Sequence, residues 1–233
     1  MGSTRLPGKV LMDLGGQTVL ARGVRRLRRA SLIQQVVIAT TDSPKDDAIV
    51  HECNRLGVVY FRGSEEDVLD RYYRTAEATG ADAVVRVTSD CPLIDPEISD
   101  KVIRAFLERQ SDYASNTLQR TYPRGLDTEV MTRDALARTW REARKPYQRT
   151  HVTAYIYENP DWFDLLAVTG ESDHSDCRWT VDTPEDLSFV RAVYERMGGC
   201  DDFSWRDVLA LLDREPALVE LNRHIAQKAV HEG

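Results

Sequence analysis

The sequence predicts an α/β fold, in which helices cover both faces of a mostly parallel, mixed sheet to give a three-layer α/β/α sandwich. Short apolar runs at 36–39, 58–61 and 83–87 are typical of strands that are buried on both faces. Amphipathic helical patterns alternate with these runs. The connections between successive strands are too long for hairpins, so we expect parallel pairing through right-handed crossovers.

Helix boundaries are visible in the first half of the chain. Leu20, Val24 and Leu27 recur at helical spacing and predict a helix over about 17–29. Proline or acidic capping residues predict further helix starts near residues 44, 67 and 96, and Gly57 and Gly80 are typical helix ends. Strands and helices therefore alternate up to about residue 110.

The second half of the sequence is less regular. Apolar runs predict strands at 113–116, 128–131 and 163–168. Helical patterns surround Leu136 and cover about 151–157, 184–196, 204–212 and 217–230. The sequence contains no internal repeat or linker, so residues 1–233 are interpreted as a single domain with an irregular insertion at about 111–165.

The composition argues against several classes of protein. The 233 residues are 42% hydrophobic and 30% charged, as in ordinary globular proteins, and a net charge of −7 argues against general nucleic-acid binding. No apolar run approaches the roughly 20 residues of a membrane helix, and no signal peptide is evident. The four cysteines lack the spacing of a zinc site or a disulfide framework, which favours a cytoplasmic location. Five arginines between residues 22 and 29 are interpreted as the solvated face of the first helix.

The first nine residues form a candidate phosphate-binding loop. Gly2 and Ser3 are small, a Pro-Gly turn follows, and Arg5 and Lys9 supply two cations. Backbone N–H groups and cations in such a loop can converge on one anion. A Walker A motif is excluded, because the glycine spacing differs and an apolar residue follows Lys9 where that motif has a hydroxyl residue.

Two aspartates are candidate metal ligands. Asp90 follows the apolar run at 83–87, and Asp182 ends a short apolar segment before a helix that starts with proline. Ligands of open parallel sheets bind beyond the carboxyl ends of the strands, and Mg²⁺ prefers one or two carboxylates together with phosphate oxygens. Each aspartate could instead cap the helix that follows it. Together with the loop, the two carboxylates define a candidate nucleotide site.

Seven motifs occur in an order shared with a known family. They are GSTRLPGKV at 2–10, VIATTD at 37–42, DVLDRY at 67–72, TSDCPLIDP at 88–96, YPRGLDTE at 122–129, HVT at 151–153 and WTVDTPEDL at 179–187. On these motifs the chain resembles the cytidylyltransferases of the spore-coat polysaccharide biosynthesis protein F type, which are relatives of the CMP-KDO and CMP-sialate synthetases. The resemblance covers essentially the whole chain and implies a GT-A-like nucleotidyltransferase fold.

The resemblance also implies an activity. An enzyme of this family makes an activated sugar from CTP and releases pyrophosphate, with Mg²⁺ as the cofactor and surface polysaccharide as the destination of the sugar. It implies that the loop, through Gly2, Ser3, Arg5 and Lys9, holds the triphosphate and that the two aspartates hold the metal. We hypothesise that a sugar hydroxyl attacks the α-phosphorus in line while Arg5 and Lys9 stabilise the leaving pyrophosphate. A homodimer is expected by analogy with the relatives.

The segment 122–129 and His151 are candidates for binding the sugar. Arg124 could bind a carboxylate of the acceptor, and Asp127 or Glu129 could accept hydrogen bonds from sugar hydroxyls. The alternatives are an exposed turn residue for Arg124 and a local hydrogen bond at a helix start for His151. A role in dimerisation is a further expectation for the insertion at 111–165.

Two residues close to Asp90 could contact the cytosine edge, namely Arg86 and Thr88. Ordinary packing in the sheet explains both nearly as well. Thr150 departs from the family pattern, because relatives tend to have an acidic residue there, and this affects acceptor specificity.

A second departure concerns the start of the chain. Family members have an apolar strand that ends in arginine just before the loop, and the sequence does not contain it. Either the coding sequence starts farther upstream, or the protein begins within its active-site loop. Without that strand, its neighbours in the sheet should expose unpaired N–H and C=O groups.

Two other functions are compatible with the sequence. A glycosyltransferase with the same fold would use a preformed nucleotide-sugar, but it usually needs a D-x-D motif where Ser89-Asp90-Cys91 offers one acid. A non-catalytic nucleotide-binding subunit is the other alternative, and the missing strand motivates it.

Overall fold

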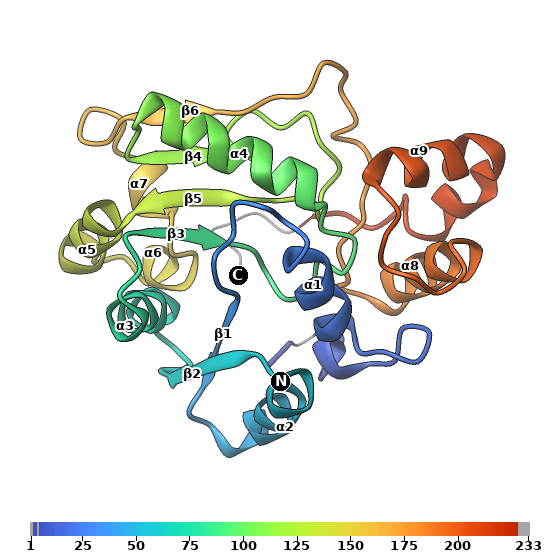
Figure 1. Cartoon of the computed structure of the whole chain (residues 1–233), viewed down its shortest axis with the longest axis horizontal. Helices are drawn as coiled ribbons and strands as arrows, with labels where there is room; N and C mark the ends of the chain where they lie inside the picture. Colours follow the sequence, from blue (N-terminus) through green and yellow to red (C-terminus); the bar gives the residue numbers. More distant parts are fainter. Residues whose placement is uncertain (1, 4, 228–233) are drawn as a thin grey trace.

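Two sheets lie among layers of helices (Figure 1). The structure is a computed structural model that describes residues 2–3 and 5–227. In chain order its elements are η1 (Lys9–Leu11), α1 (Val19–Leu27), β1 (Val37–Thr41), η2 (Pro44–Asp46), α2 (Asp47–Leu56), β2 (Val59–Gly63), α3 (Val68–Thr79), β3 (Ala83–Arg86), α4 (Pro96–Arg109), β4 (Tyr113–Ser115), β5 (Glu129–Thr132), α5 (Arg133–Glu142), α6 (Pro146–Thr150), α7 (Ala154–Tyr157), β6 (Leu165–Ala167), α8 (Pro184–Arg196), α9 (Trp205–Arg214) and η3 (Pro216–Leu221).

The direction of strand pairing differs between the two sheets. β1 and β2 are parallel, with Val37 opposite Val59. The second sheet has the order β3-β5-β4-β6, in which β5 runs antiparallel to both neighbours and β4 and β6 are parallel. The expected α/β class with a mixed sheet is confirmed, but the parallel pairing expected of β3 is wrong. Because the chain reverses between β4 and β5, β5 arrives antiparallel and takes the position beside β3.

Side chains of the second sheet alternate between two layers of helices. Tyr113 and Met131 pack with residues of α3, α5 and α7, whereas the adjacent Ala114 and Val130 pack with α4. Successive residues of a strand point to opposite faces, so both faces of this sheet are covered. The three-layer arrangement expected from the sequence follows directly from this alternation.

A cavity of about 520 Å³ separates the two sheets. Residues of β1 and β3 line it, together with apolar side chains of α1, α3 and α4 such as Val24, Ala76 and Phe106. Within the described part of the chain, β1 pairs only with β2 and β3 only with β5, so each strand has one edge outside any ladder.

Two arginines of α1 are buried, which corrects the prediction that all five arginines of residues 22–29 form a solvated face. Arg22 and Arg26 are 1% and 0% exposed. Their guanidinium groups lie 4.3 Å from the ring centres of Tyr194 and Phe203. They donate to the backbone carbonyls of residues 14, 15, 94, 199, 201 and 203. Both arginines therefore join α1 to the loop before α9, because the planar guanidinium can satisfy several buried acceptors at once.

The predicted helix over 217–230 is wrong in extent. The chain there forms the short 3₁₀ helix η3, residues 222–227 are not helical, and residues 228–230 lie outside the described part. The side chain of Asn222 donates to the Arg178 carbonyl at 2.8 Å and to Asp186 Oδ1 at 3.0 Å. These bonds tie the segment to the loop before α8 and to the first turn of α8. The helix predicted over 184–196 is confirmed as α8.

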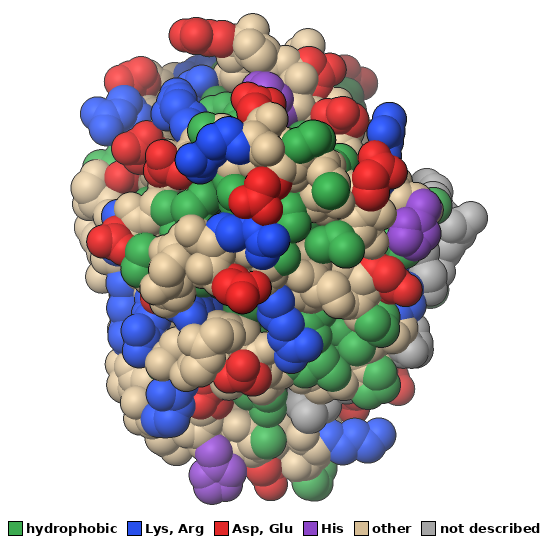
Figure 2. Space-filling view, turned by 90° about the vertical axis from the view of Figure 1, so that its right-hand side faces the viewer, with side chains coloured by type: hydrophobic (Ala, Val, Ile, Leu, Met, Phe, Trp, Pro, Cys, Tyr) green, Lys and Arg blue, Asp and Glu red, His purple; other side chains and the backbone are tan. Residues whose placement is uncertain are grey.

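Two features of the helices and of one face bear on contacts with membranes and nucleic acids. In the residues that the structure describes, no helix is long and apolar enough to cross a membrane. On the face formed by α8 and α9, acidic and basic side chains are interspersed (Figure 2). This face therefore offers no continuous basic strip for a nucleic-acid backbone.

We predict that Arg26→Leu destabilises the fold by about 3–5 kcal/mol, because it leaves buried carbonyls and the carboxylate of Asp95 without their cation. Arg26 Nη2 lies 3.9 Å from Asp95 Oδ2, and both side chains are buried. Arg25 lies on the same helix with 46% of its side chain exposed, so Arg25→Leu should change stability by less than about 0.5 kcal/mol. Urea denaturation of the two variants measures the difference, and equal stabilities would contradict the structural role of Arg26.

Candidate active site

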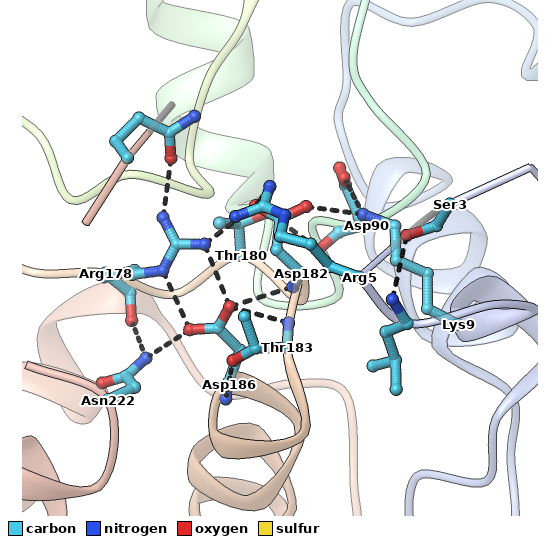
Figure 3. Close-up of polar contacts among 12 residues, drawn as sticks. Ser3, Arg5, Lys9, Asp90, Arg178, Thr180, Asp182, Thr183, Asp186 and Asn222 are labelled. Carbon is cyan, nitrogen blue, oxygen red and sulfur yellow. Dashed lines mark hydrogen bonds and ion pairs between the residues drawn. The ribbon is translucent and has the colours of Figure 1, made fainter. Parts of the chain in front are cut away.

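Three charged side chains from distant parts of the sequence meet at one point. Lys9 Nζ lies 2.6 Å from Asp90 Oδ2 and 2.7 Å from Asp182 Oδ1 (Figure 3). Arg5 Nη2 lies 3.0 Å from the other oxygen of Asp182. The structure therefore brings together the loop cations and the two aspartates that the sequence singled out.

Hydrogen bonds within the described residues shape the loop that carries Lys9. Ser3 Oγ accepts a hydrogen bond from the backbone N–H of Leu6 at 3.2 Å, and the Leu6 side chain is buried. Gly8 has φ +70°, a left-handed conformation that glycine adopts without a steric penalty. The turn at Gly8 leads into η1, so Lys9 sits at the start of a short helix with its side chain directed at the aspartates.

Asp90 lies beyond the end of β3, where the sequence placed it. It does not cap α4, because Asp95 fills that position and accepts from the N–H groups of Glu97 and Ile98. The backbone carbonyl of Asp90 accepts from the Val181 N–H at 2.8 Å. This bond joins the segment of Asp90 to the segment of Asp182.

Asp182 is oriented by a second set of polar contacts rather than by capping α8. Arg178 Nη2 donates to Asp182 Oδ2 at 2.8 Å, and Arg178 also binds both oxygens of Asp186. Thr183 caps α8, with a capping box between Thr183 and Asp186. Asp186 also accepts from the Asp182 N–H at 3.0 Å. The guanidinium of Arg178 therefore sits between two carboxylates and fixes the side chain of Asp182 (Figure 3).

The charges of the cluster shift the pKa values of its members. Burial by itself would lower the pKa of Lys9, but Asp90 and Asp182 outweigh burial and raise it above its ordinary value. Burial by itself would raise the pKa of Asp182, but Lys9, Arg178 and Arg5 outweigh burial and lower it. At neutral pH, Lys9 is therefore a cation and Asp182 an anion.

A close backbone approach positions the strand-like segment before Asp182. The Arg124 N–H donates to the Cys177 carbonyl at 2.9 Å, and the Trp179 N–H donates to the Arg124 carbonyl at 2.6 Å. Gly125 has φ +107°, and a Cβ atom there would lie 2.7 Å from the Trp179 carbonyl carbon. Only glycine fits at this position, because any side chain would overlap the backbone of the neighbouring segment.

Two of the candidate sugar-binding residues lie in this same segment. Asp127 forms a two-point ion pair with Arg120, at 2.6 and 2.8 Å. Arg124 is half-buried, and its pKa is lowered by burial and by repulsion from Arg120. A guanidinium in such surroundings favours an additional anion, and the role of Arg124 at an acceptor carboxylate stays a prediction.

The other candidates lie around a buried carboxylate. Glu129 forms an ion pair with Arg86, and it accepts from the hydroxyl groups of Tyr113 and Thr153, each at 2.6 Å. Its oxygens are thus engaged by protein groups. His151 is the C-terminal cap of α6, so the expectation that it starts a helix over 151–157 is wrong: that helix, α7, begins at Ala154.

Two further candidates have few polar contacts in the site. The Thr88 hydroxyl lies 3.2 Å from Cys91 Sγ. Gly2 is exposed. Their proposed contacts with the nucleotide, like those of Arg86, Glu129 and His151 with base or sugar, stay predictions.

Sequence reasoning missed Arg178, Asp186 and Asn222, which hold Asp182 in place. The pattern Thr-Pro-Glu-Asp before a helical run already indicated that Asp186 belongs to a capping box. No local pattern identified Arg178 or Asn222, since their partners come from α8 and from the C-terminal segment.

The ligands that the site could offer to a metal ion are carboxylates. Among the described residues, no group of three His, Cys, Asp or Glu side chains is arranged to hold a metal ion. The cluster offers two carboxylates that converge on one cation position. That number suits Mg²⁺ only if phosphate oxygens and water complete its shell.

The fold is that of an α/β protein, and beyond the end of β3 the loop cations Arg5 and Lys9 meet the carboxylates of Asp90 and Asp182. The cytidylyltransferase family matches residues 1–204, and the chain belongs to this family. The resemblance inferred from the seven motifs is therefore confirmed.

Known proteins are similar to the chain over most of its length. It is 37% identical over 223 residues to the spore coat polysaccharide biosynthesis protein SpsF of Bacillus subtilis, covering 93% of this chain and 92% of that protein. The solved structure of a cytidylyltransferase from Leptospira borgpetersenii is similar with a TM-score of 0.91 and 33% identity, over 98% of this chain and 95% of that one. A CMP:2-keto-3-deoxy-manno-octonic acid synthetase complexed with CTP shares the fold, with a TM-score of 0.63 and 20% identity over 84% and 95% of the two chains.

We predict that Gly125→Ala displaces the segment that carries Asp182 and destabilises the fold. Gly198→Ala is the matched control, because Gly198 has φ +69° but a Cβ atom there meets nothing within 4 Å. The control should cost about 1–2 kcal/mol for the left-handed conformation alone. Gly125→Ala should cost about 1–3 kcal/mol more, as expected of steric overlap. Thermal denaturation compares them, and equal losses would show that the close approach at Gly125 is unimportant.

Proposed function

We infer that the chain transfers CMP from CTP to a hydroxyl group of an acidic or amino sugar, releases pyrophosphate and requires Mg²⁺. Membership of the cytidylyltransferase family supports the nucleotidyl transfer. The contact of one ammonium group with Asp90 and Asp182 is the observation that carries the assignment of the site. Surface polysaccharide synthesis is proposed from the similarity to SpsF.

The residues present fit a magnesium ion. Two carboxylate oxygens already converge on one positive charge, and the hard oxygens of carboxylates are the ligands that Mg²⁺ prefers. Asp90 and Asp182 would hold the ion with the phosphates of the nucleotide. When bound, Mg²⁺ would neutralise charge on the phosphates and help to orient the attacking oxygen.

The protein's own contribution is positioning and charge. Arg5 would bind two phosphate oxygens through its planar guanidinium, and Lys9 would act as a point charge. In the reaction, the sugar hydroxyl would lose its proton to water, its oxygen would form a bond to the α-phosphorus, and the bond from the α-phosphorus to the oxygen that bridges to the β-phosphorus would break. The leaving pyrophosphate gains negative charge, which Arg5 and Lys9 would stabilise.

The sugar would bind beside the segment 122–129. Arg124 supports an acidic acceptor, because burial and a neighbouring arginine make its guanidinium favourable toward a carboxylate. A homodimer, with the insertion at 111–165 contributing to the interface, is part of the same proposal.

We predict that Asp90→Asn lowers kcat/KM for CTP at least about 100-fold and leaves the fold intact, because the variant loses one of two charges that hold the cation and orient the phosphates. Asp82→Asn is the matched control, since 94% of the Asp82 side chain is exposed. The assay measures pyrophosphate release from each nucleoside triphosphate with a panel of acidic and amino sugars. Full Mg²⁺-dependent turnover by Asp90→Asn would remove Asp90 from the mechanism. CTP binding without turnover on any sugar would favour a nucleotide-binding subunit.

A further inference from the structure

The cation position between Asp90 and Asp182 is occupied by a side chain of the protein itself. One nitrogen atom, Lys9 Nζ, contacts an oxygen of each aspartate at 2.6 and 2.7 Å. Only 13% of the Lys9 side chain is exposed. A divalent cation bound by the same two oxygens would need the same position, so the ammonium group and the metal exclude each other there.

Both aspartates of the cation position are already paired with cations of the protein. Contacts between described residues link three carboxylates, Asp90, Asp182 and Asp186, with three cations, Arg5, Lys9 and Arg178. A divalent cation therefore meets carboxylates that already have positively charged partners. It would have to separate an ion pair before it could bind, which weakens its binding.

The three cations are held with different strength. Arg178 is fixed by Asp186 and by Gln227 Oε1, at 2.7–3.0 Å. Lys9 has a flexible side chain of four methylene groups, which makes its two contacts through the terminal nitrogen alone. Lys9 can therefore turn to another anion, whereas Arg178 stays with Asp182.

We propose that Lys9 acts as an internal competitor of the divalent cation and that phosphates of the nucleotide draw it away, so that metal and nucleotide bind cooperatively. This inference rests on the proposed function, since it takes a nucleoside triphosphate as the ligand. As long as no nucleotide is bound, Lys9 pairs with Asp90 and Asp182 and competes with the metal. When a triphosphate binds, Lys9 pairs with its oxygens and both carboxylates become available. By thermodynamic linkage, the factor by which the nucleotide increases the affinity for the metal is also the factor by which the metal increases the affinity for the nucleotide.

The test measures metal binding directly, without turnover. Free Mn²⁺ is followed by electron paramagnetic resonance in the wild type and in Lys9→Met, with no nucleotide present. Lys9→Met should bind one Mn²⁺ about tenfold or more tightly than the wild type, because its two carboxylates have lost the competing cation. Asp90→Asn in the Lys9→Met background should abolish the gain. Lys45→Met, which changes an exposed lysine, should match the wild type.

A second variant and a second ligand complete the test. Lys9→Gln keeps a polar side chain but loses the charge, and it should show the same increase in Mn²⁺ affinity. The comparison therefore still decides the question if Lys9→Met alone fails to fold. In the wild type, Mn²⁺ should bind tightly only after a non-hydrolysable CTP analogue is added. Equal Mn²⁺ affinity of the wild type and both Lys9 variants without nucleotide would overturn the proposal. Failure of the wild type to bind the CTP analogue would instead overturn the proposed function, because the nucleotide-free comparison does not depend on CTP.

Discussion

The backbone hydrogen bond between Asp90 and Val181 is the constraint on which the site depends. It spans 2.8 Å and joins the segment after β3 to the segment before α8. Because each segment carries an aspartate, the bond places two carboxylates side by side, where their repulsion has to be offset. Lys9, Arg5 and Arg178 offset it, and Gly125 lets a third segment pack against the same strand-like backbone.

Much of this arrangement could be predicted from local sequence patterns. Asp90 and Asp182 follow apolar runs, and the carboxyl ends of strands are where ligands bind. The bounds of α8 were also predictable, because Thr183, Pro184 and Asp186 form a helix-start pattern that depends on neighbouring residues only. The predicted strands of the first sheet are correct for the same reason, although β1 and β2 begin and end one or two residues later than expected.

The features that the sequence did not predict depend on partners that are distant in the sequence. Arg22 and Arg26 have the spacing of an exposed helical face, yet carbonyl groups of the loop around residue 200 lie against α1 and bury them. Arg178 has its partners on α8 and near residue 227. The antiparallel position of β5 follows from the chain reversal between β4 and β5, and it pairs Arg86 with Glu129, which lie 43 residues apart in the sequence. No periodicity within one element encodes such contacts, because tertiary packing overrides local preference.

The two aspartates and the loop cation Lys9 are held by different kinds of contact. Asp90 and Asp182 are anchored by backbone bonds and by the network of Arg178 and Asp186. Lys9 lies at the start of a short 3₁₀ helix after a glycine turn, and among the described residues the Leu6 N–H donates to Ser3 Oγ and the Lys9 N–H to the Leu6 carbonyl. In the proposed exchange, an incoming phosphate would attract the side chain of Lys9 and leave the carboxylates in place. The ion pairs of Lys9 with Asp90 and Asp182 are thus the contacts that the ligand would exchange, and the strength of these pairs sets how much binding free energy the exchange would cost.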